Sequence, residues 1–322
     1  MKTRVLICGA TGFIGRNLTE QLSKRSNLEV HATRFQRDAY DCPNVIWHQA
    51  DLRNPENIEP IIKDMDVLIQ AAGAPSDAKD MLVRPSIHVT DNAVLNSYLF
   101  QAAFEHRLKH VIFFSCTVMY SSSDRALKES DFDAARPLQP RYFGVGNTKL
   151  YLEKICEFYA SISDIKFTAI RHSNVYGPHD KFFRETNQDF ASMLTKVMTA
   201  KDKVHIWGTG EEAFDLIYAN DLVRFVELSI KNQTEQYRLY NCGYGQAISV
   251  NDLVQKLIAH SGKNLSVVHD LSHATNKTSL FLDCSLAKQE IDWEVATDLD
   301  TGIKETIAWW EENTGRKMPL VA

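Results

Sequence analysis

The chain has 322 residues, of which 44% are hydrophobic, and its 36 basic and 41 acidic side chains give a formal net charge of -5. A chain of this length and composition can bury a large core without disulfides or metal ions. The near balance of charges, without a dense basic stretch, argues against a nucleic-acid-binding protein, because such a protein needs a concentrated basic surface.

The cysteines and the apolar runs indicate where the protein works. The six cysteines lie far apart and show none of the short paired spacings that zinc sites and redox dithiols use. No apolar run reaches the roughly 18 residues of a membrane span, and the short run 5–10 leads into a glycine loop instead of a cleavage site. We therefore expect a cytoplasmic protein without a membrane partner.

Short apolar runs alternate with longer amphipathic stretches through the first half of the chain. This alternation is typical of parallel strands joined by helices. Because each strand–helix–strand unit crosses over in the right-handed sense, the pattern predicts a doubly wound parallel α/β sheet, the Rossmann fold. Strands are expected at residues 4–8, 29–33, 45–47, 66–69, 111–114 and 167–170, and helices at 13–24, 55–63, 92–106 and 148–162.

The regular alternation ends at a polar, proline-containing segment, residues 178–189. Beyond it, short strands such as 204–207 mix with helices such as 251–260 and 301–312. We predict a dinucleotide-binding domain and a smaller, interleaved α/β substrate-binding lobe. The domain would comprise residues 1–172 and about 214–245, and the lobe residues 173–213 and 246–322.

A glycine-rich loop follows the first expected strand and precedes a helix. Glycines let the backbone turn tightly and approach a pyrophosphate, and the free amides and dipole of a helix N-terminus favour an anion. A turn that uses glycine only for its geometry is the alternative, but the strands and helices that follow favour dinucleotide binding. The predicted cofactor contacts in this loop are Gly9, Thr11, Gly12, Phe13, Ile14 and Gly15.

The end of the second expected strand bears on the choice of cofactor. A dinucleotide-binding domain holds the adenosine ribose there, and an acidic residue accepts a hydrogen bond from the free 2′-hydroxyl of NAD. This chain has Thr33-Arg34 instead, with Arg37 close behind. Arginine can pair with a 2′-phosphate, although Arg34 could also be a solvated surface charge. We predict NADP(H) in preference to NAD(H).

These motifs, together with others farther along the chain, resemble the extended short-chain dehydrogenase/reductase family of the NAD-dependent epimerase/dehydratase type. The resemblance covers nearly the whole chain and includes segments 174–178, 207–210 and 215–218. Segment 176–182 and the Thr33-Arg34 strand end are most similar to the GDP-fucose synthase branch, the 4-keto-6-deoxy sugar epimerase/reductases. The resemblance implies hydride transfer between a nicotinamide and a sugar carbon, and a homodimer formed through helices 92–106 and 148–162.

The proton-transfer residues of that family are altered here. In the family, a tyrosine four residues before a lysine exchanges a proton with the sugar oxygen. The lysine is Lys149, but the tyrosine position is Val145, and Cys116 takes the place of a serine or threonine. Tyr142 could act only if the helix breaks, because seven helical residues span about 10.5 Å. We interpret Cys116 as a small apolar residue rather than a nucleophile. The candidate catalytic residues are Lys149, Cys116, Thr117 and Tyr142.

The resemblance also implies contacts beyond the glycine loop. Phe214 stands where the family often has an arginine for the substrate diphosphate, a loss that Lys277, Arg184 or Lys181 could offset. Val118 and Gln188 stand where the branch has the Cys and His of 3,5-epimerisation. That epimerisation is therefore not expected. The implied cofactor contacts are Arg34, Asp51, Leu52, Ala71, Ala72, Gly73, Asn92, Ser115, Lys149 and His172, and the substrate contacts are Asn174, Lys181, Gln188, Trp207 and Phe214.

Two hypotheses for function follow. The first is an NADP(H)-dependent enzyme that oxidises, reduces or dehydrates a nucleotide-linked sugar at C4. The second is a non-catalytic cofactor-binding protein, a sensor or partner subunit, which the combined changes at Val145, Cys116, Gln188 and Phe214 would produce. No metal site is expected, because the His106/His110 and His269/His273 pairs lack a third ligand.

Overall fold

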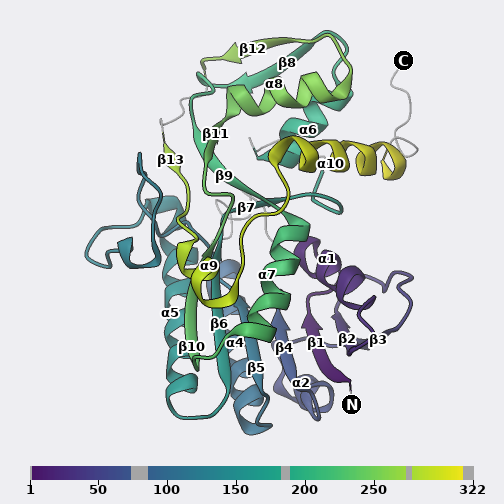
Figure 1. Ribbon diagram of the computed structural model, residues 1–322, viewed down its shortest axis with the longest axis vertical. Coiled ribbons are helices and arrows are strands. Elements are labelled where there is room, and N and C mark those ends of the chain that lie inside the picture. The colour runs from purple at the N-terminus through teal and green to yellow at the C-terminus, as the bar shows by residue number, and fades with distance from the viewer. Residues whose placement is uncertain (1, 74–85, 183–188, 273–277, 315–322) are drawn as a thin grey trace.

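A seven-stranded parallel sheet forms the centre of the larger domain. The computed structural model describes residues 2–73, 86–182, 189–272 and 278–314, and the strand order of this sheet is β10-β6-β5-β4-β1-β2-β3 (Figure 1). The chain starts in the middle, winds to one edge and returns to build the other, so the predicted doubly wound fold is confirmed. The strands are β1 (Thr3–Cys8), β2 (Leu28–Arg34), β3 (Val45–Gln49), β4 (Val67–Gln70), β5 (His110–Phe114), β6 (Lys166–His172) and β10 (Tyr237–Cys242).

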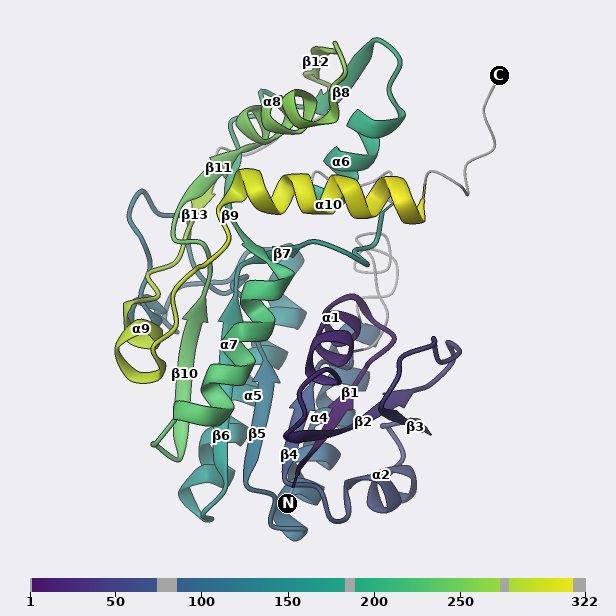
Figure 2. The ribbon, with the colours of Figure 1, turned by 45° about the vertical axis from the view of Figure 1, so that its right-hand side comes forward.

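Helices cover both faces of this sheet. Because side chains alternate along a strand, Val5 and Ile7 face one core while Leu6 faces another. The first core is closed by α1 (Phe13–Leu22) and α7 (Ala219–Asn232), which lie in front of the sheet in Figure 2. The second core is closed by α2 (Pro55–Ile62), α4 (Ser86–Glu105) and α5 (Phe143–Ser161). No helix in the described segments has an apolar stretch long enough to cross a bilayer.

A smaller lobe lies beyond the carboxyl ends of the large sheet's strands (Figure 1). Its core joins Leu194, Leu253 and Ile303, one from each of its three helices. The helices of the lobe are α6 (Phe190–Thr199), α8 (Val250–Ser261) and α10 (Leu299–Asn313). One of its sheets contains β7 (Asn174–Tyr176), β9 (Ala213–Tyr218), β11 (Ala247–Ser249) and β13 (Ser279–Leu280). The other sheet pairs β8 (Lys203–Trp207) with β12 (Ser266–Asp270). Two 3-10 helices, η1 (Glu129–Asp131) and η2 (Pro140–Tyr142), lie between β5 and α5.

Two stretches pack differently from the expected division. Residues 214–218, expected in the dinucleotide-binding domain, form most of β9 in the small sheet. Helix α9 (Ser285–Ile291), expected in the lobe, returns to the large domain, where Ile291 and Trp293 join the core beneath α7. The Trp293 indole donates a hydrogen bond to the Asp221 carbonyl on α7, at 3.0 Å. The lobes are therefore more interleaved than the sequence indicated.

Candidate active site

The glycine loop is shaped by close backbone contacts. Gly9 has φ +77°, a left-handed conformation, and a Cβ there would lie 2.6 Å from the Ala72 Cα. A Cβ on Gly15 would meet the Gly9 backbone. Neither site has room for a side chain, and Gly9 adopts a conformation that other residues rarely tolerate. The glycines thus bring the ends of β1 and β4 and the start of α1 together.

The first turn of α1 presents free backbone amides. Gly12 precedes the helix and offers no side-chain cap, and the first turn contains no acidic residue. The N–H groups of Phe13 and Ile14 stand at the first two helical positions, where no intrahelical acceptor exists. Thr11, Gly12 and Phe13 line a cavity of about 460 Å³. This end of the helix can therefore hold an anionic group such as a phosphate.

The loop after β4 completes this edge of the site. Ala71 donates its N–H to the Cys8 carbonyl at 3.1 Å, which ties the ends of β4 and β1 together. Gly73 approaches α4, where a Cβ on it would lie 3.3 Å from the Asn92 Oδ1. The predicted contacts Ala71, Ala72, Gly73 and Asn92 thus adjoin the glycine loop.

Two buried amides that the sequence analysis missed support that loop. Gln70 and Asn96 are each 2% exposed. The Gln70 Oε1 accepts from the Ala72 N–H at 3.1 Å, and its Nε2 donates to the Asn96 Oδ1 at 3.0 Å. The sequence signal for this support was a glutamine at the end of an otherwise apolar strand, because a buried polar side chain is rarely left without a hydrogen-bond partner.

Two arginines lie near the outer side of the glycine loop. Arg34, at the end of β2, donates to the Gln49 Oε1 at 3.0 Å, and its guanidinium is 3.9 Å from the carboxylate of Asp38, a fully exposed side chain. Arg37 donates to the Thr11 carbonyl at 3.2 Å. The N–H groups of both guanidinium groups therefore lie near the position that the adenosine ribose of a bound dinucleotide would occupy.

Asp51 and Leu52 follow β3 on the same side of the sheet. Arg53 donates to both oxygens of the Asp51 carboxylate, at 2.7 and 2.9 Å, and these hydrogen bonds lower the pKa of Asp51. Leu52 is 8% exposed and belongs to the core beneath α4. The Asp51 carboxylate is thus already paired.

Hydrogen bonds pin the loop after β7 to α1. Asn17 donates to the Pro178 carbonyl at 2.8 Å, and the His179 Nε2 donates to the Glu20 carboxylate at 3.0 Å. Burial alone would raise the pKa of Glu20, but hydrogen bonds from His179 and Arg16 lower it to about 2. His179 therefore joins the loop after β7 to α1.

Lys149 occupies the other end of the site, where β5 ends. It projects from α5, and its Nζ donates to the Phe114 carbonyl at 2.6 Å. The ammonium lies 4.8 Å from the centre of the Phe113 ring, which adds a cation–π contact. Burial lowers the pKa of Lys149. The lysine is thus held at the carboxyl edge of the sheet, where ligands of doubly wound folds bind.

The helix that carries Lys149 has no break. Helix α5 runs unbroken from Phe143, so Val145 and Lys149 share one helical face. Tyr142 lies in η2, ahead of the first helical residue. The break that would bring Tyr142 to Lys149 is therefore absent, and its predicted catalytic role loses its basis.

Close packing explains why α5 contains glycines at positions 144 and 146. A Cβ on Gly144 would lie 2.9 Å from the Val89 Cγ2, and one on Gly146 would lie 2.7 Å from the Leu138 Cδ1. These glycines bring α5 close to its neighbours.

The three residues after β5 have different surroundings. The Ser115 hydroxyl donates to the Glu153 Oε1 at 2.5 Å, and Glu153 in turn pairs with Arg171 at 2.7 Å. The side chains of that ion pair are 5% and 3% exposed. Burial raises the pKa of the Cys116 thiol, which keeps it neutral. The Thr117 side chain is half-buried, and its hydroxyl bonds to no residue that the structure describes.

His172 ends β6, next to Lys149 in space. Its ring contacts the edge of Phe114, with centroids 6.0 Å apart, and its Nδ1 bonds to the Ser173 carbonyl at 2.8 Å. Burial lowers the pKa of His172 to about 4; the charge of Lys149 acts in the same direction, and the bond to Ser173 opposes both. The imidazole is therefore neutral near pH 7.

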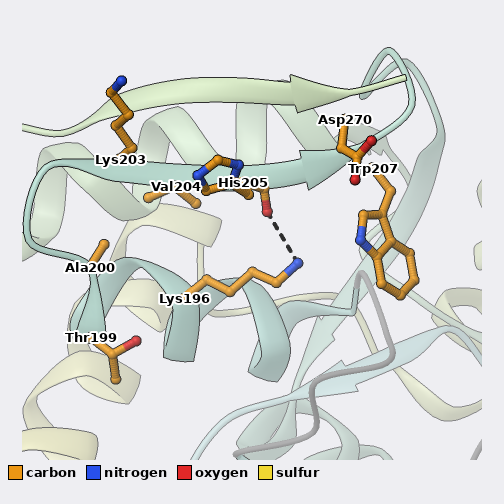
Figure 3. Close-up of a pocket in the computed structure, with 8 residues that line it drawn as sticks. All are labelled: Lys196, Thr199, Ala200, Lys203, Val204, His205, Trp207 and Asp270. Atoms are coloured by element: carbon orange, nitrogen blue, oxygen red, sulfur yellow. Dashed lines mark hydrogen bonds between the residues drawn. The ribbon is translucent and has the colours of Figure 1, made fainter. Parts of the chain in front are cut away.

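A second cavity, of about 340 Å³, lies in the small lobe between α6 and β8. Figure 3 shows Lys196 reaching from α6 toward the edge of β8, with the Trp207 indole beside it. The Lys196 Nζ donates to the His205 carbonyl at 3.2 Å and lies 5.3 Å from the Trp207 ring. Burial lowers the pKa of Lys196. The predicted substrate residue Trp207 thus lines a cavity that also carries cationic side chains.

The other predicted substrate residues do not gather around Trp207. Lys181 lines the cavity at the glycine loop instead. The Asn174 side chain donates to the Asp215 carbonyl, and Phe214 lies in β9, where it packs against the lobe core. Gln188 falls outside the described residues.

The histidine pairs have separate partners. His106 bonds to Glu59 at 2.9 Å, while His110, in β5, bonds to Thr168 at 2.7 Å. His269 bonds to Asn251, and His273 lies outside the described residues. The described part of the chain contains no group of three His, Cys, Asp or Glu side chains that could hold a metal ion.

Comparison with known proteins agrees with this geometry. The chain is 24% identical over 318 residues to GDP-L-colitose synthase of Yersinia pseudotuberculosis, covering 95% of this chain and 97% of that one. It is 25% identical over 319 residues to dTDP-4-dehydro-6-deoxy-D-allose reductase of Streptomyces bikiniensis, covering 96% and 97%. The crystal structure of UDP-glucuronic acid 4-epimerase from Bacillus cereus with UDP-glucuronic acid and NAD superimposes with a TM-score of 0.82, at 22% identity and 96% and 99% coverage. Residues 5–243 match the model of the NAD dependent epimerase/dehydratase family, and the chain belongs to that family.

Proposed function

We propose that the protein is an NADP(H)-dependent enzyme that oxidises, reduces or dehydrates a nucleotide-linked sugar at C4. The observation that supports this proposal most directly is that the uncapped start of α1 and the ammonium of Lys149 lie at the same carboxyl edge of one sheet. A dinucleotide with its pyrophosphate at α1 and its nicotinamide ribose at Lys149 spans that edge. When bound, the cofactor supplies or accepts the hydride. Lys149 holds the ribose and stabilises negative charge on the reacting oxygen.

The arginines at the end of β2 support a preference for NADP(H). The strand β2 ends in Thr33-Arg34 instead of an acidic residue, and the guanidinium groups of Arg34 and Arg37 can pair with a 2′-phosphate. We expect Arg34→Ala to weaken NADPH binding about 10- to 100-fold, the range for one charge-assisted hydrogen bond, and to change NADH binding less than about twofold. The Bacillus cereus relative was solved with NAD. Wild-type protein that binds NADH as tightly as NADPH in calorimetric titration would overturn the preference.

The cavity between α6 and β8 suits the nucleoside diphosphate part of the substrate. Trp207 offers an aromatic face on which a base can stack, and Lys196 and Lys203 line the same cavity with positive charge. Titration with GDP, UDP, dTDP and CDP tests this assignment. We expect one of them to bind, and Trp207→Ala to weaken it about tenfold or more, because one stacked base contributes about 1–3 kcal/mol.

Turnover tests the proposed function directly. NADPH is mixed with 4-keto sugar nucleotides, and NADP⁺ with the corresponding alcohols, while the nicotinamide absorbance is followed. We expect Lys149→Met to lower kcat at least 100-fold. Lys154→Met is the matched control, because Lys154 lies on the same helix, is exposed and pairs with Glu157. Absence of turnover in the wild type with every nucleotide sugar would overturn the proposed function.

A second candidate function is non-catalytic cofactor binding, which Val145 favours. On the unbroken α5, Val145 holds the helical position four residues before Lys149 and cannot transfer a proton. This alternative predicts tight NADPH binding without turnover. It also predicts that Val145→Tyr combined with Cys116→Ser creates activity that the wild type lacks.

The outer face of α4 and α5 supports a homodimer. Four of the large apolar side chains that the described residues expose lie on these two helices: Val89, Phe143, Tyr151 and Phe158. Contiguous apolar patches mark protein interfaces, and a patch formed by one face of two packed helices suits a two-fold contact with a second copy. We expect sedimentation at the dimer mass for the wild type and at the monomer mass for Tyr151→Glu with Phe158→Glu. Leu271→Glu, at an exposed site in the small lobe, is the control.

A further inference from the structure

With valine at position 145, proton transfer to or from the sugar oxygen needs another carrier. The neighbouring strand ends β5 and β6 bring three ionisable groups near one another: Cys116, Lys149 and His172. The strands pair in parallel with Phe114 opposite Ile170, and the Ser115 N–H bonds to the Ile170 carbonyl at 2.8 Å. Cys116 follows the end of β5 by two residues, and His172 is the last residue of β6. The charge of Lys149 acts on both of them.

The hydrogen bond of His172 fixes its tautomer. A carbonyl oxygen only accepts, so the bond to Ser173 requires the proton to sit on Nδ1. The Nε2 then carries a lone pair. Among the residues that the structure describes, none bonds to Nε2, and this atom is not among the fully buried unpaired ones. The imidazole is therefore anchored at one nitrogen and presents a base at the other.

We propose that His172 is the catalytic residue that exchanges a proton with the sugar oxygen, in the place that tyrosine holds in the family. This inference rests on the proposed function. In oxidation, the O–H bond of the sugar alcohol breaks and its proton passes to the His172 Nε2. The C–H electron pair leaves as hydride to the nicotinamide, and a C=O bond forms. In reduction, the imidazolium returns the proton to the oxygen.

The groups around His172 favour its neutral form. Lys149 on α5 adds to the lowering of the His172 pKa, and the thiol of Cys116 stays neutral because burial raises its pKa. Cys242, opposite His172 in β10, is a buried thiol whose pKa is likewise raised. The Asp215 carboxylate on β9 accepts hydrogen bonds from the N–H groups of Tyr244, Gly245 and Leu282. His172 is thus ready to accept a proton, so oxidation needs no prior ionisation, whereas reduction should speed up as the pH falls.

The test separates the proton-carrying role from a structural one. His172→Asn can keep a donor for the Ser173 carbonyl while removing the Nε2 base. We expect its kcat to fall about 100-fold or more, the range for general acid–base catalysis, and its NADPH affinity to change by a much smaller factor. His172→Ala should regain at least about tenfold of its lost rate when imidazole is added. His106→Asn, remote and bonded to Glu59, is the control.

A second variant keeps the inference falsifiable if a change at His172 disturbs the fold. Val145→Tyr places a phenol one turn before Lys149, and added to His172→Asn it should restore turnover without imidazole. An active wild type whose rate survives His172→Asn would overturn the role of His172 alone. A wild type that binds NADPH but turns over no nucleotide sugar would overturn the proposed function and this inference together.

Discussion

The two ends of the site differ in what builds them. At the glycine loop the contacts are made by backbone: the close approach of Gly9 to Ala72 and the free amides at the start of α1. At the other end the chemistry depends on single side chains, where valine stands at position 145 on an intact helix. The fold therefore preserves the cofactor end as a consequence of its geometry, whereas the chemical end can change without altering any strand or helix.

The first prediction concerns the buried ion pair beneath the chemical end. Glu153→Gln should destabilise the protein by about 3–5 kcal/mol, because it leaves Arg171 charged and buried without its partner. Lys154→Ala, which breaks the exposed pair with Glu157 on the same helix, should cost less than about 1 kcal/mol. Urea unfolding of both variants measures the difference. Equal effects would contradict the burial that the structure assigns to the first pair.

Adding one methyl group at the glycine loop should destabilise the protein strongly. Gly9→Ala combines a left-handed backbone with a Cβ 2.6 Å from the Ala72 Cα, so we expect a loss of about 2–4 kcal/mol and of NADPH binding. Gly262→Ala is the matched control, since Gly262 has φ +68° but nothing within 4 Å of the added Cβ. It should cost only about 1 kcal/mol. Thermal unfolding and calorimetry report both effects.

The contact between the lobes should depend on pH. Glu20 has a folded pKa of about 2 against an ordinary value of 4.5, so its contribution is fully present above pH 4.5 and is lost as the pH falls toward 2. Glu20→Gln should therefore cost about 1–2 kcal/mol at pH 7, after allowance for screening at a side chain that is 30% exposed. The difference from wild type should shrink between pH 4.5 and 2 in urea titrations. A constant difference would show that Glu20 acts without its charge.

Cys116→Ser should have the smallest effect. Burial raises the pKa of the Cys116 thiol, so the group is neutral and is not a nucleophile at pH 7. We expect kcat to change less than about threefold by the nicotinamide absorbance assay. A loss comparable to that of His172→Asn would move the chemistry to the cysteine.

The large sheet was predictable because each of its strands is encoded by a short stretch of neighbouring residues. β1 and β4 begin and end within one residue of the expected bounds, since short apolar runs flanked by turn residues encode buried strands directly. The glycine loop was predictable for the same reason, as its glycines serve contacts close to the first strand. The expectation of a nucleotide-sugar enzyme came from the similarity of the whole sequence pattern to one family.

Long-range contacts explain what the sequence did not reveal. Gly144 and Gly146 make room for Val89 and Leu138, and nothing local in the sequence indicates those neighbours. Helix α9 was assigned to the wrong lobe because its partner α7 lies far away in sequence. His172 was expected to contact cofactor, but only the approach of Lys149 and the bond to Ser173 suggested a base.

Single-turnover mixing tests the central claim most directly. A stoichiometric amount of NADPH-loaded protein is mixed with the 4-keto sugar nucleotide whose diphosphate binds best, and the nicotinamide absorbance is followed. We expect loss of that absorbance in the wild type and in Lys154→Met, and a rate at least about 100-fold lower in Lys149→Met. Tight binding of both ligands without any absorbance change in the wild type would contradict it, and would identify the chain as a binding protein that keeps the fold without the chemistry.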